Sequence, residues 1–336
     1  MRYFMGVDAG ATKTFALVGD ETGRLIALGK GGPGNHQTPG GVERAMGCIA
    51  EAVDAALAAA GLAPAELAHA SFCLAGADFP SDYELLNGAI ASRWPGLRFT
   101  VHNDGIAGLR AGTSQGWGVV SICGTGTNQL GIGKDGRELQ VAGMGGLWGD
   151  FGGGADLGRE AIKVAFMGDD QRGPDTLLTT IVLEHFGYPS MYAFGQDLYA
   201  GKIDRSLIPK LAPHVFTAAN MGDVVAQEIL IGMGTALGIS VGAVIRQLHL
   251  TGDVVEVVMA GSTWKGANPL MVDSFRLSVH RTAPWAKLVR PRYEPVVGAW
   301  LVAAERSGIQ VDKAIYATLE ATLPGEIPVI REETGC

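Results

Sequence analysis

The sequence has few cysteines, and none of them stands at the spacing of a metal site. Cys48, Cys73, Cys123 and Cys336 show no CxxC arrangement. Isolated cysteines are typical of reduced thiols, and we expect three of these to be buried and the last to lie in a tail. They argue against a zinc or iron–sulfur site built by this chain alone, and they favour a reducing compartment, the cytoplasm.

Positively charged residues and long apolar runs are also scarce. Lys and Arg number 26 against 34 Asp and Glu, which gives a net charge of −8. Nucleic acid is therefore not an expected partner, because its phosphate backbone requires a basic surface. No segment reaches about 18 consecutive apolar residues, so no membrane span is expected. The first residues run straight into an apolar strand and show no signal-peptide pattern.

What the chain does contain is typical of a globular protein with two domains. Apolar residues make up 47% and charged residues 18% of its 336 positions. Domains commonly contain about 100–200 residues, so this length predicts two of them, each large enough to bury its own core.

The first third of the chain predicts an α/β domain. Three apolar runs separated by turn residues predict an antiparallel meander, and two further strands and two helices follow. The predicted strands cover residues 2–8, 14–19, 24–29, 70–75 and 97–101, and the predicted helices cover 39–61 and 81–93. This order favours a mixed sheet flanked by helices.

The pattern starts again near residue 115, which indicates an internal duplication. A second set of strands is predicted at 117–123, 128–133, 138–142, 254–260 and 286–290. Between them lie a glycine-rich loop at 143–158, expected to be mobile and functional, and several helices. A helical pattern over 220–250 is expected to break near residues 232–238. We therefore expect two domains of one shape that face each other across a cleft.

Two glycine-rich turns lie at the tips of the first hairpin of each half. They consist of Gly10, Ala11, Thr12 and Lys13 in the first half and of Gly124, Thr125, Gly126 and Thr127 in the second. Backbone N–H groups and hydroxyls at such tips can face a phosphate, although plain hairpin turns and an exposed turn lysine fit the same pattern. The first turn is not a Walker A loop, because Thr12 stands where that motif requires glycine.

Two aspartates at strand ends are candidates for chemistry. Asp8, directly before the first turn, is placed to hold Mg²⁺ through water, or else to bond its own backbone as a turn residue. Asp104 follows the strand 97–101 and is the candidate general base that takes the proton of an acceptor hydroxyl. From spacing alone, Asp104 is explained equally well as the N-cap of a helix at 106–110.

Polar side chains in the glycine-rich loops are candidates for binding a sugar. Asn35, His36 and Asp150 suit hydrogen bonds to a polyol. His36 also fits a plain loop histidine, and Asp150 fits the cap of the following helix.

A third turn, made of Gly261, Ser262 and Thr263, follows the strand 254–260. Ligands of open α/β sheets bind at the carboxyl ends of strands, so this turn is a candidate site for the base and ribose of a nucleotide. An ordinary strand-to-helix turn has the same appearance.

Taken in order, these motifs resemble the sugar kinase, Hsp70 and actin superfamily. Within it they look like the N-acetylglucosamine kinase branch, which also includes bacterial glucosamine kinases and the BadF-type activator ATPases. The resemblance covers about residues 3–305. It rests on the segments 6–14, 35–36, 103–107, 121–128, 145–150, 260–263 and 296–299.

The resemblance implies a fold and a reaction. The fold would consist of two actin-like (ribonuclease H-like) domains, each a mixed five-stranded sheet flanked by helices, with a cleft between them. The reaction would use ATP and Mg²⁺ to phosphorylate the 6-hydroxyl of N-acetylglucosamine or glucosamine after the domains close. Asp104 would accept the proton, and Asn35, His36, Gly145 and Asp150 would hold the sugar.

The expected domains follow from the duplication and the resemblance. The first covers residues 1–113 and is completed by a helix at about 295–310, and the second, larger one covers 114–294 and contains a helical insertion. Residues 325–336 are expected to form a loose tail. We expect a homodimer that binds ATP and a sugar.

One position departs from the pattern of the family. The family usually reads Gly-Asp-Glu-Gly in the acceptor loop, whereas this chain reads Gly149-Asp150-Phe151-Gly152, so the identity of the sugar stays open. The activator ATPases carry cysteines for a shared iron–sulfur cluster, and none of the four cysteines here has a matching setting. An ATPase that drives a partner protein and a sugar-binding regulator remain the alternatives.

Overall fold

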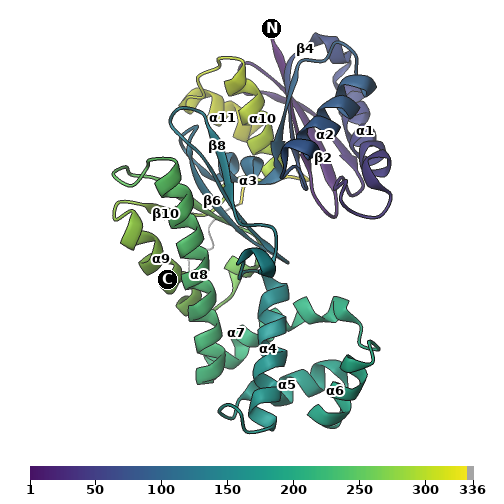
Figure 1. Ribbon diagram of the computed structural model, residues 1–336. Helices are drawn as coiled ribbons and strands as arrows, with labels where there is room; N and C mark the ends of the chain where they lie inside the picture. The colour runs from purple at the N-terminus through teal and green to yellow at the C-terminus, as the bar shows by residue number, and fades with distance from the viewer. Residues whose placement is uncertain (331–336) are drawn as a thin grey trace.

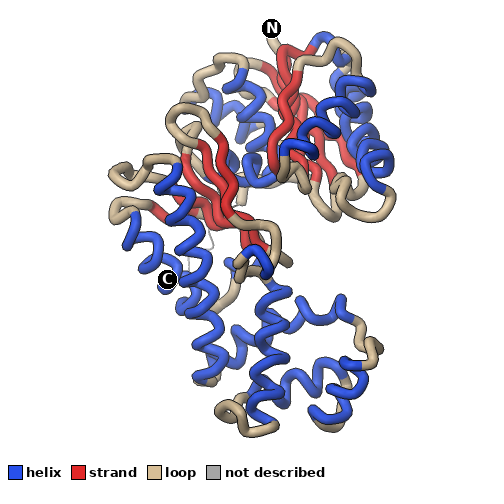
Figure 2. Tube along the Cα trace, viewed as in Figure 1, coloured by secondary structure: helices blue, strands red, loops and turns tan. Residues whose placement is uncertain are grey.

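The computed structural model describes residues 1–330 and contains two five-stranded sheets with helices packed on their faces (Figures 1 and 2). The first sheet has the strand order β3-β2-β1-β4-β5. Its strands are β1 (Tyr3–Ala9), β2 (Thr14–Asp20), β3 (Leu25–Gly31), β4 (Leu67–Leu74) and β5 (Phe99–Asn103). The first three strands are antiparallel, and β4 and β5 run parallel to β1.

The second sheet repeats this arrangement in the order β10-β9-β6-β7-β8. Its strands are β6 (Gly118–Cys123), β7 (Thr127–Ile132), β8 (Glu138–Val141), β9 (Glu256–Ala260) and β10 (Lys287–Val289). Counted from β8, the order and the strand directions match those of the first sheet. The predicted duplication and the predicted mixed five-stranded sheets are therefore confirmed.

Helices cover both faces of the first sheet. On one face, residues of α1 (Gly41–Ala60) and α2 (Pro80–Arg93) share a core with Met5 and Val7 of β1. On the other face, α10 (Pro295–Arg306) and α11 (Lys313–Ala321) pack around Phe4 of β1. After the second sheet the chain thus returns to the first one, where α10 and α11 complete its cover of helices.

The short helix α3 (Asp104–Gly112) lies between the two sheets and joins them. Its Ile106 and Leu109 share a small buried cluster with Val120 of β6, Leu130 of β7 and Val258 of β9. The first residue of α3 therefore sits at the boundary between the two domains.

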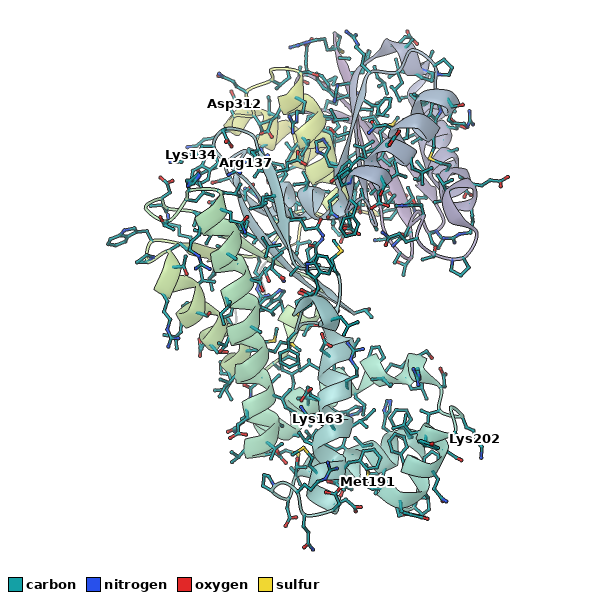
Figure 3. The ribbon with its side chains drawn as sticks, viewed as in Figure 1. Lys134, Arg137, Lys163, Met191, Lys202 and Asp312 are labelled. Atoms are coloured by element: carbon teal, nitrogen blue, oxygen red, sulfur yellow. The ribbon has the colours of Figure 1, made fainter. Side chains whose placement is uncertain are left out.

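Helices also cover the outer face of the second sheet and form a separate lobe. The long helices α8 (Val224–Gln247) and α9 (Pro269–Thr282) lie on the sheet, and α4 (Gly154–Asp169) leads away from it. The lobe consists of α5 (Leu177–Phe186), α6 (Met191–Tyr199), α7 (Ala212–Asn220) and the 3₁₀ turn Arg205–Leu211. Met191 is buried within this lobe, while Lys163 and Lys202 lie on its surface far from α3 (Figure 3).

The expectation that the helical pattern over 220–250 breaks near residues 232–238 is wrong. The helix α8 runs unbroken through Gly232, Gly234 and Gly238, because Gly234 and Gly238 provide close contact with α9 and not a bend. A side chain at Gly234 would overlap the carbonyl of Met271.

By length and composition α8 could cross a membrane, with a mean hydropathy of 1.8 over 18 residues, but 56% of that window is buried inside the protein.

The described part of the predicted loose tail is packed. Ile327 is fully buried beside α10, and the backbone N–H of Ile330 donates to the carbonyl of Arg292 at 2.8 Å. The rest of that prediction, residues 331–336 with Cys336, lies outside the described residues. Of the other cysteines, Cys73 and Cys123 are buried as expected, whereas Cys48 is only half-buried.

Candidate active site

Asp104 is the first residue of α3, at the carboxyl end of β5. The N-cap of this helix is Asn103, whose Oδ1 accepts the backbone N–H of Gly105 at 2.9 Å. The alternative reading of Asp104 as the N-cap is therefore wrong, and its carboxylate is available for another role. Burial, with a further contribution from the charge of Asp78, raises the pKa of Asp104 to about 6. This value is suited to a general base near neutral pH.

Asp8 and Asp104 meet at one edge of the first sheet. Since β1, β4 and β5 are parallel neighbours, the register brings Ala9 beside Leu74 and Leu74 beside Asn103. Burial and the nearby charge of Asp104 raise the pKa of Asp8 to about 7, against the opposing effect of Lys13. Two carboxylates that repel each other in this way favour a cation between or beside them.

The first glycine-rich turn is tight and leaves its tip exposed. The N–H of Gly10 donates to the carbonyl of Lys13 at 3.0 Å, while Ala11, Thr12 and Lys13 lie at the surface. The Nζ atom of Lys13 is 3.6 Å from Glu294 and 4.4 Å from the centre of the Phe15 ring. Lys13 therefore has partners within the protein beside the turn.

The second turn is held by the start of α4. The N–H groups of Gly154 and Ala155 donate to the carbonyls of Gly124 and Thr125 at 2.7 and 2.9 Å. Thr125 and Gly126 are exposed at the tip, whereas the hydroxyl of Thr127 donates to the carbonyl of Ile122 at 2.8 Å. The exposed tip offers backbone groups to an anion, and the hydroxyl of Thr127 stabilises the hairpin.

The turn after β9 lies against the second turn. Thr263 is buried, and its hydroxyl donates to the carbonyl of Gly124 at 2.9 Å. Gly261 and Ser262 remain exposed. The three residues are thus placed beside the second turn, but the Thr263 side chain connects two loops and only its neighbours face outward.

A cavity of about 450 Å³ lies between the two domains. Asp78 and Phe79 of the first domain line one side, and Gln140 of β8 with Trp148 and Asp150 of the acceptor loop line the other. A second cavity of about 270 Å³ shares Asp78 and Gln140 with it and reaches Asn103. The two cavities extend from the acceptor loop to the start of α3.

Asp150 presents one bonded and one unbonded oxygen. Its Oδ2 accepts the N–H groups of Gly143 and Gly145 at 2.9 and 2.6 Å. Its Oδ1 is buried and has no hydrogen-bond partner among the described residues, and the residue as a whole is only 9% exposed. The alternative role as cap of the next helix is wrong, because Gly153 occupies that position in α4. Gly145 contributes to the site by holding Asp150.

Asn35 and His36 lie in a loop that is hydrogen-bonded to Asp78 and Asp82 of the first domain. The Oδ1 of Asn35 accepts the N–H of Gln37 at 2.8 Å, and Gln37 also donates to Asp78 at 3.4 Å. His36 is buried, with its Nε2 3.2 Å from Asp82 and its Nδ1 without a partner among the described residues. Asn35 is thus the more accessible of the two.

Phe151 does not enter either cavity. Its ring packs against the core of the second domain and lies 3.9 Å from where a side chain at Gly232 of α8 would begin. Neither cavity is lined by this residue. The phenyl ring therefore contributes to the wall of neither cavity.

The sequence reasoning missed Asp78, Gln140 and the aromatic pair of Phe79 and Trp148. Asp78 follows β4, the strand between those that lead to Asp8 and Asp104, so its position after an apolar strand was the signal that could have revealed it. Gln140 and Trp148 had no such signal, because only the packing of the domains brings them to the cleft.

Comparisons with known proteins agree with this arrangement. The model of the BadF/BadG/BcrA/BcrD ATPase family matches residues 5–303. An N-acetylmuramic acid/N-acetylglucosamine kinase of Clostridium acetobutylicum is 28% identical over 303 residues, covering 90% of this chain and 98% of that protein. An N-acetyl-D-glucosamine kinase of Dictyostelium discoideum is 28% identical over 316 residues, covering 89% and 97%.

A solved structure shares the fold. The structure of a candidate N-acetylglucosamine kinase from Chromobacterium violaceum matches with a TM-score of 0.62 at 24% identity, over 90% of this chain and 99% of that one. The two sheets and their helices are therefore arranged as in that structure.

Proposed function

The chain belongs to the BadF/BadG/BcrA/BcrD ATPase family, and from this membership we propose that it is an ATP-dependent amino-sugar kinase. It transfers the γ-phosphate of ATP to the 6-hydroxyl of N-acetylglucosamine or glucosamine. Curated relatives that match about nine tenths of the chain are kinases of such sugars, which supports this assignment.

One observation carries the proposal. The carboxylate of Asp104, freed from capping by Asn103, lies at the domain boundary with a pKa near neutrality. Its charge interacts with that of Asp78, which lines both cavities, and with that of Asp8, which directly precedes the first glycine-rich turn. A base near both a candidate phosphate turn and a polar cavity suits phosphoryl transfer to a hydroxyl.

The residues suggest the following division of work. Asp150, through its free Oδ1, and Asn35 hold sugar hydroxyls and orient the acceptor. Asp104 takes the proton of the 6-hydroxyl as the new O–P bond forms, and the bond from the γ-phosphorus to the β,γ-bridging oxygen breaks to release ADP. Backbone groups at the exposed tips of the turns at 10–13 and 124–127 bind phosphate oxygens, and Gly261 and Ser262 lie against the adenosine.

The residues present fit a magnesium ion. Burial and the nearby charge of Asp104 raise the pKa of Asp8, and a cation beside the two carboxylates would relieve this cost. Asp8 would hold Mg²⁺ through water, and the ion would neutralise charge on the phosphates of ATP.

We also propose that the enzyme acts as a homodimer in the cytoplasm, on small molecules and without nucleic acid or a membrane.

A coupled ADP-release assay over a panel of hexoses, with and without Mg²⁺, tests the proposal. ADP release that requires both Mg²⁺ and an amino sugar is the expected result, with the sugar 6-phosphate identified as the product. Turnover that is independent of every sugar would instead support an ATPase that drives a partner protein. Sugar binding without any turnover would support a regulator.

A further inference from the structure

Asp78 is a carboxylate in the acceptor cleft whose hydrogen-bond partners in the structure are neutral. Its Oδ1 accepts the side-chain amides of Asn103 at 3.0 Å and Gln140 at 3.1 Å, and its Oδ2 is 3.4 Å from the amide of Gln37. Gln140 belongs to the second domain, so Asp78 is bonded from both sides of the cleft. It lines both cavities.

The other acidic groups that line these cavities are Glu138 and Asp150. Glu138 of the second cavity forms an ion pair with Arg306 at 2.7 Å and lies 2.8 Å from the His102 ring. Asp150 accepts two backbone N–H groups. No Lys, Arg or His is among the described residues that line either cavity. The space between the domains is therefore negative, and Asp78, which is bonded from both domains, has only neutral hydrogen-bond partners in it.

Two further carboxylates, those of Asp82 and Asp104, lie near Asp78. The backbone N–H of Asp78 donates to Asp82 of α2, which is itself paired with His36. At the start of α3, the carboxylate of Asp104 lies close enough for the two charges to interact. A cation that entered the cavity would reduce the repulsion between Asp78 and Asp104, whereas an anion would add to it.

We propose that Asp78 determines acceptor specificity by charge, and this inference rests on the proposed kinase function. Its carboxylate favours an amino sugar with a free, protonated amine over the neutral N-acetylated sugar. It disfavours an amino sugar that carries a carboxylate, because a second anion would enter a cavity without a basic residue. The unpartnered Oδ1 of Asp150, buried at the other wall, holds a hydroxyl of the same acceptor.

The substitution Asp78→Asn isolates the charge. The amide oxygen of asparagine keeps an acceptor for Asn103 and Gln140, so the packing of the cleft is retained. Since hydrogen bonds to charged groups are the strong ones, we expect kcat/KM for glucosamine to fall by about 10–100-fold. We expect kcat/KM for N-acetylglucosamine to change less than about threefold. Asp273→Asn, which removes an exposed carboxylate on α9, is the matched control.

The pH dependence provides a second readout. The KM for glucosamine of the wild-type enzyme should rise as its amine loses a proton near pH 8, a value typical of an α-amino group, while the KM for N-acetylglucosamine stays level. In Asp78→Asn the rise for glucosamine should flatten. Kinetics are measured on the full chain with glucosamine, N-acetylglucosamine, N-acetylmuramic acid and glucose.

The outcomes separate this inference from the function on which it rests. Equal loss with glucosamine and N-acetylglucosamine in Asp78→Asn, or a wild-type preference for N-acetylmuramic acid, would overturn the role of Asp78 and leave the kinase function intact. Failure of the wild-type enzyme to phosphorylate any of the four sugars would overturn the function itself.

Discussion

At the scale of single residues, the site depends on a division of work between two neighbours. Asn103 caps α3 and bonds Asp78 and Asn128, while Asp104, one position later, keeps its carboxylate for chemistry. The Asn103 amide thereby connects the start of α3 to Asp78 of the first domain and to Asn128 of the second. A change at Asn103 would therefore affect structure and chemistry together, whereas a change at Asp104 tests the chemistry alone.

Asp104→Asn is expected to remove transfer and to keep sugar binding. An amide cannot take the proton of the acceptor hydroxyl, so kcat should fall by about 10²–10⁴-fold, which is the usual contribution of a general base. The measurement is ADP release at pH 8, where the wild-type carboxylate is charged, together with calorimetric titration of the sugar. Near-normal turnover would show that Asp104 is not the base.

Asp8→Asn is expected to stabilise the protein at pH 8. The pKa of Asp8 is raised to about 7, so the stability contributed by its neutral form is present below about pH 4 and is lost as the pH rises through 7. A permanently neutral amide avoids this loss. We expect the Tm to rise by about 2–4 °C at pH 8, as for a gain of about 1 kcal/mol, and to change little at pH 4.

The same pair of proteins tests the magnesium site. Mg²⁺ should raise the Tm of the wild type and leave that of Asp8→Asn unchanged, since the ion stabilises only a folded state that binds it. An equal effect of Mg²⁺ on both proteins would place the ion elsewhere.

At the scale of elements, the position of Asp104 is set by the contact between α3 and α10. These helices approach so closely at Gly298 that a side chain there would overlap the carbonyl of Ala107. Arg110 of α3 adds a buried ion pair with Glu305 of α10 at 2.8 Å. The helix that begins with the proposed base is therefore held by packing on one side and by charge at its far end.

Gly298→Ala is expected to destabilise the protein strongly. The new methyl group meets backbone atoms of α3, which cannot rotate away, so the helices must separate at a cost of about 1–3 kcal/mol or more. The change is measured as the free energy of unfolding in urea. Gly88→Ala in α2, where a side chain meets nothing within 4 Å, is the control, and it should be neutral or slightly stabilising. Equal effects of the two variants would be inconsistent with a close contact at Gly298.

At the scale of the whole molecule, the two domains contact each other around the acceptor cavity. Asn128 donates to Asn103 at 3.1 Å, and the rings of Phe79 and Trp148 lie 6.5 Å apart, edge to face, one from each domain. Trp148 is 67% exposed, so its ring covers the cavity from outside without belonging to the core. An aromatic cover of this kind reduces the access of water to a reactive phosphate.

Trp148→Ala is expected to loosen this cover while the fold is kept. Aromatic pairs contribute about 0.5–1.5 kcal/mol, so we expect the KM for the sugar to rise by roughly 2–12-fold, with more ATP hydrolysed without sugar transfer. Both are measured by comparing ADP release with sugar phosphate formed. Trp285→Ala removes an equally exposed ring, 66% accessible, that lines neither cavity, and it should leave the ratio unchanged. A shared effect of both variants would argue against a specific cover.

Much of the fold could be read from the sequence, because strands, helices and turns follow from residues close together in the chain. The alternating apolar runs and the glycine turns marked the strands of both sheets, and their repetition revealed the duplication. The ordered motifs also singled out Asp8, Asp104 and Asp150 as candidate site residues. The helix α8 and the segment around Ile327 were misjudged, because close packing against α9 and α10 overrides the local preference of glycine and of a chain end.

The composition of the cleft was decided only by the tertiary structure. The hydrogen bond of Asp78 with Gln140, the ring of Trp148 beside Phe79 and the burial of Phe151 against α8 each join segments that are far apart in the chain. Charge in a cavity depends on which groups are near enough to compensate one another, and that is fixed by domain packing. The sequence by itself thus determined the candidates for the chemistry, Asp8, Asp104 and Asp150, and the tertiary structure decided which charged groups face the cavities.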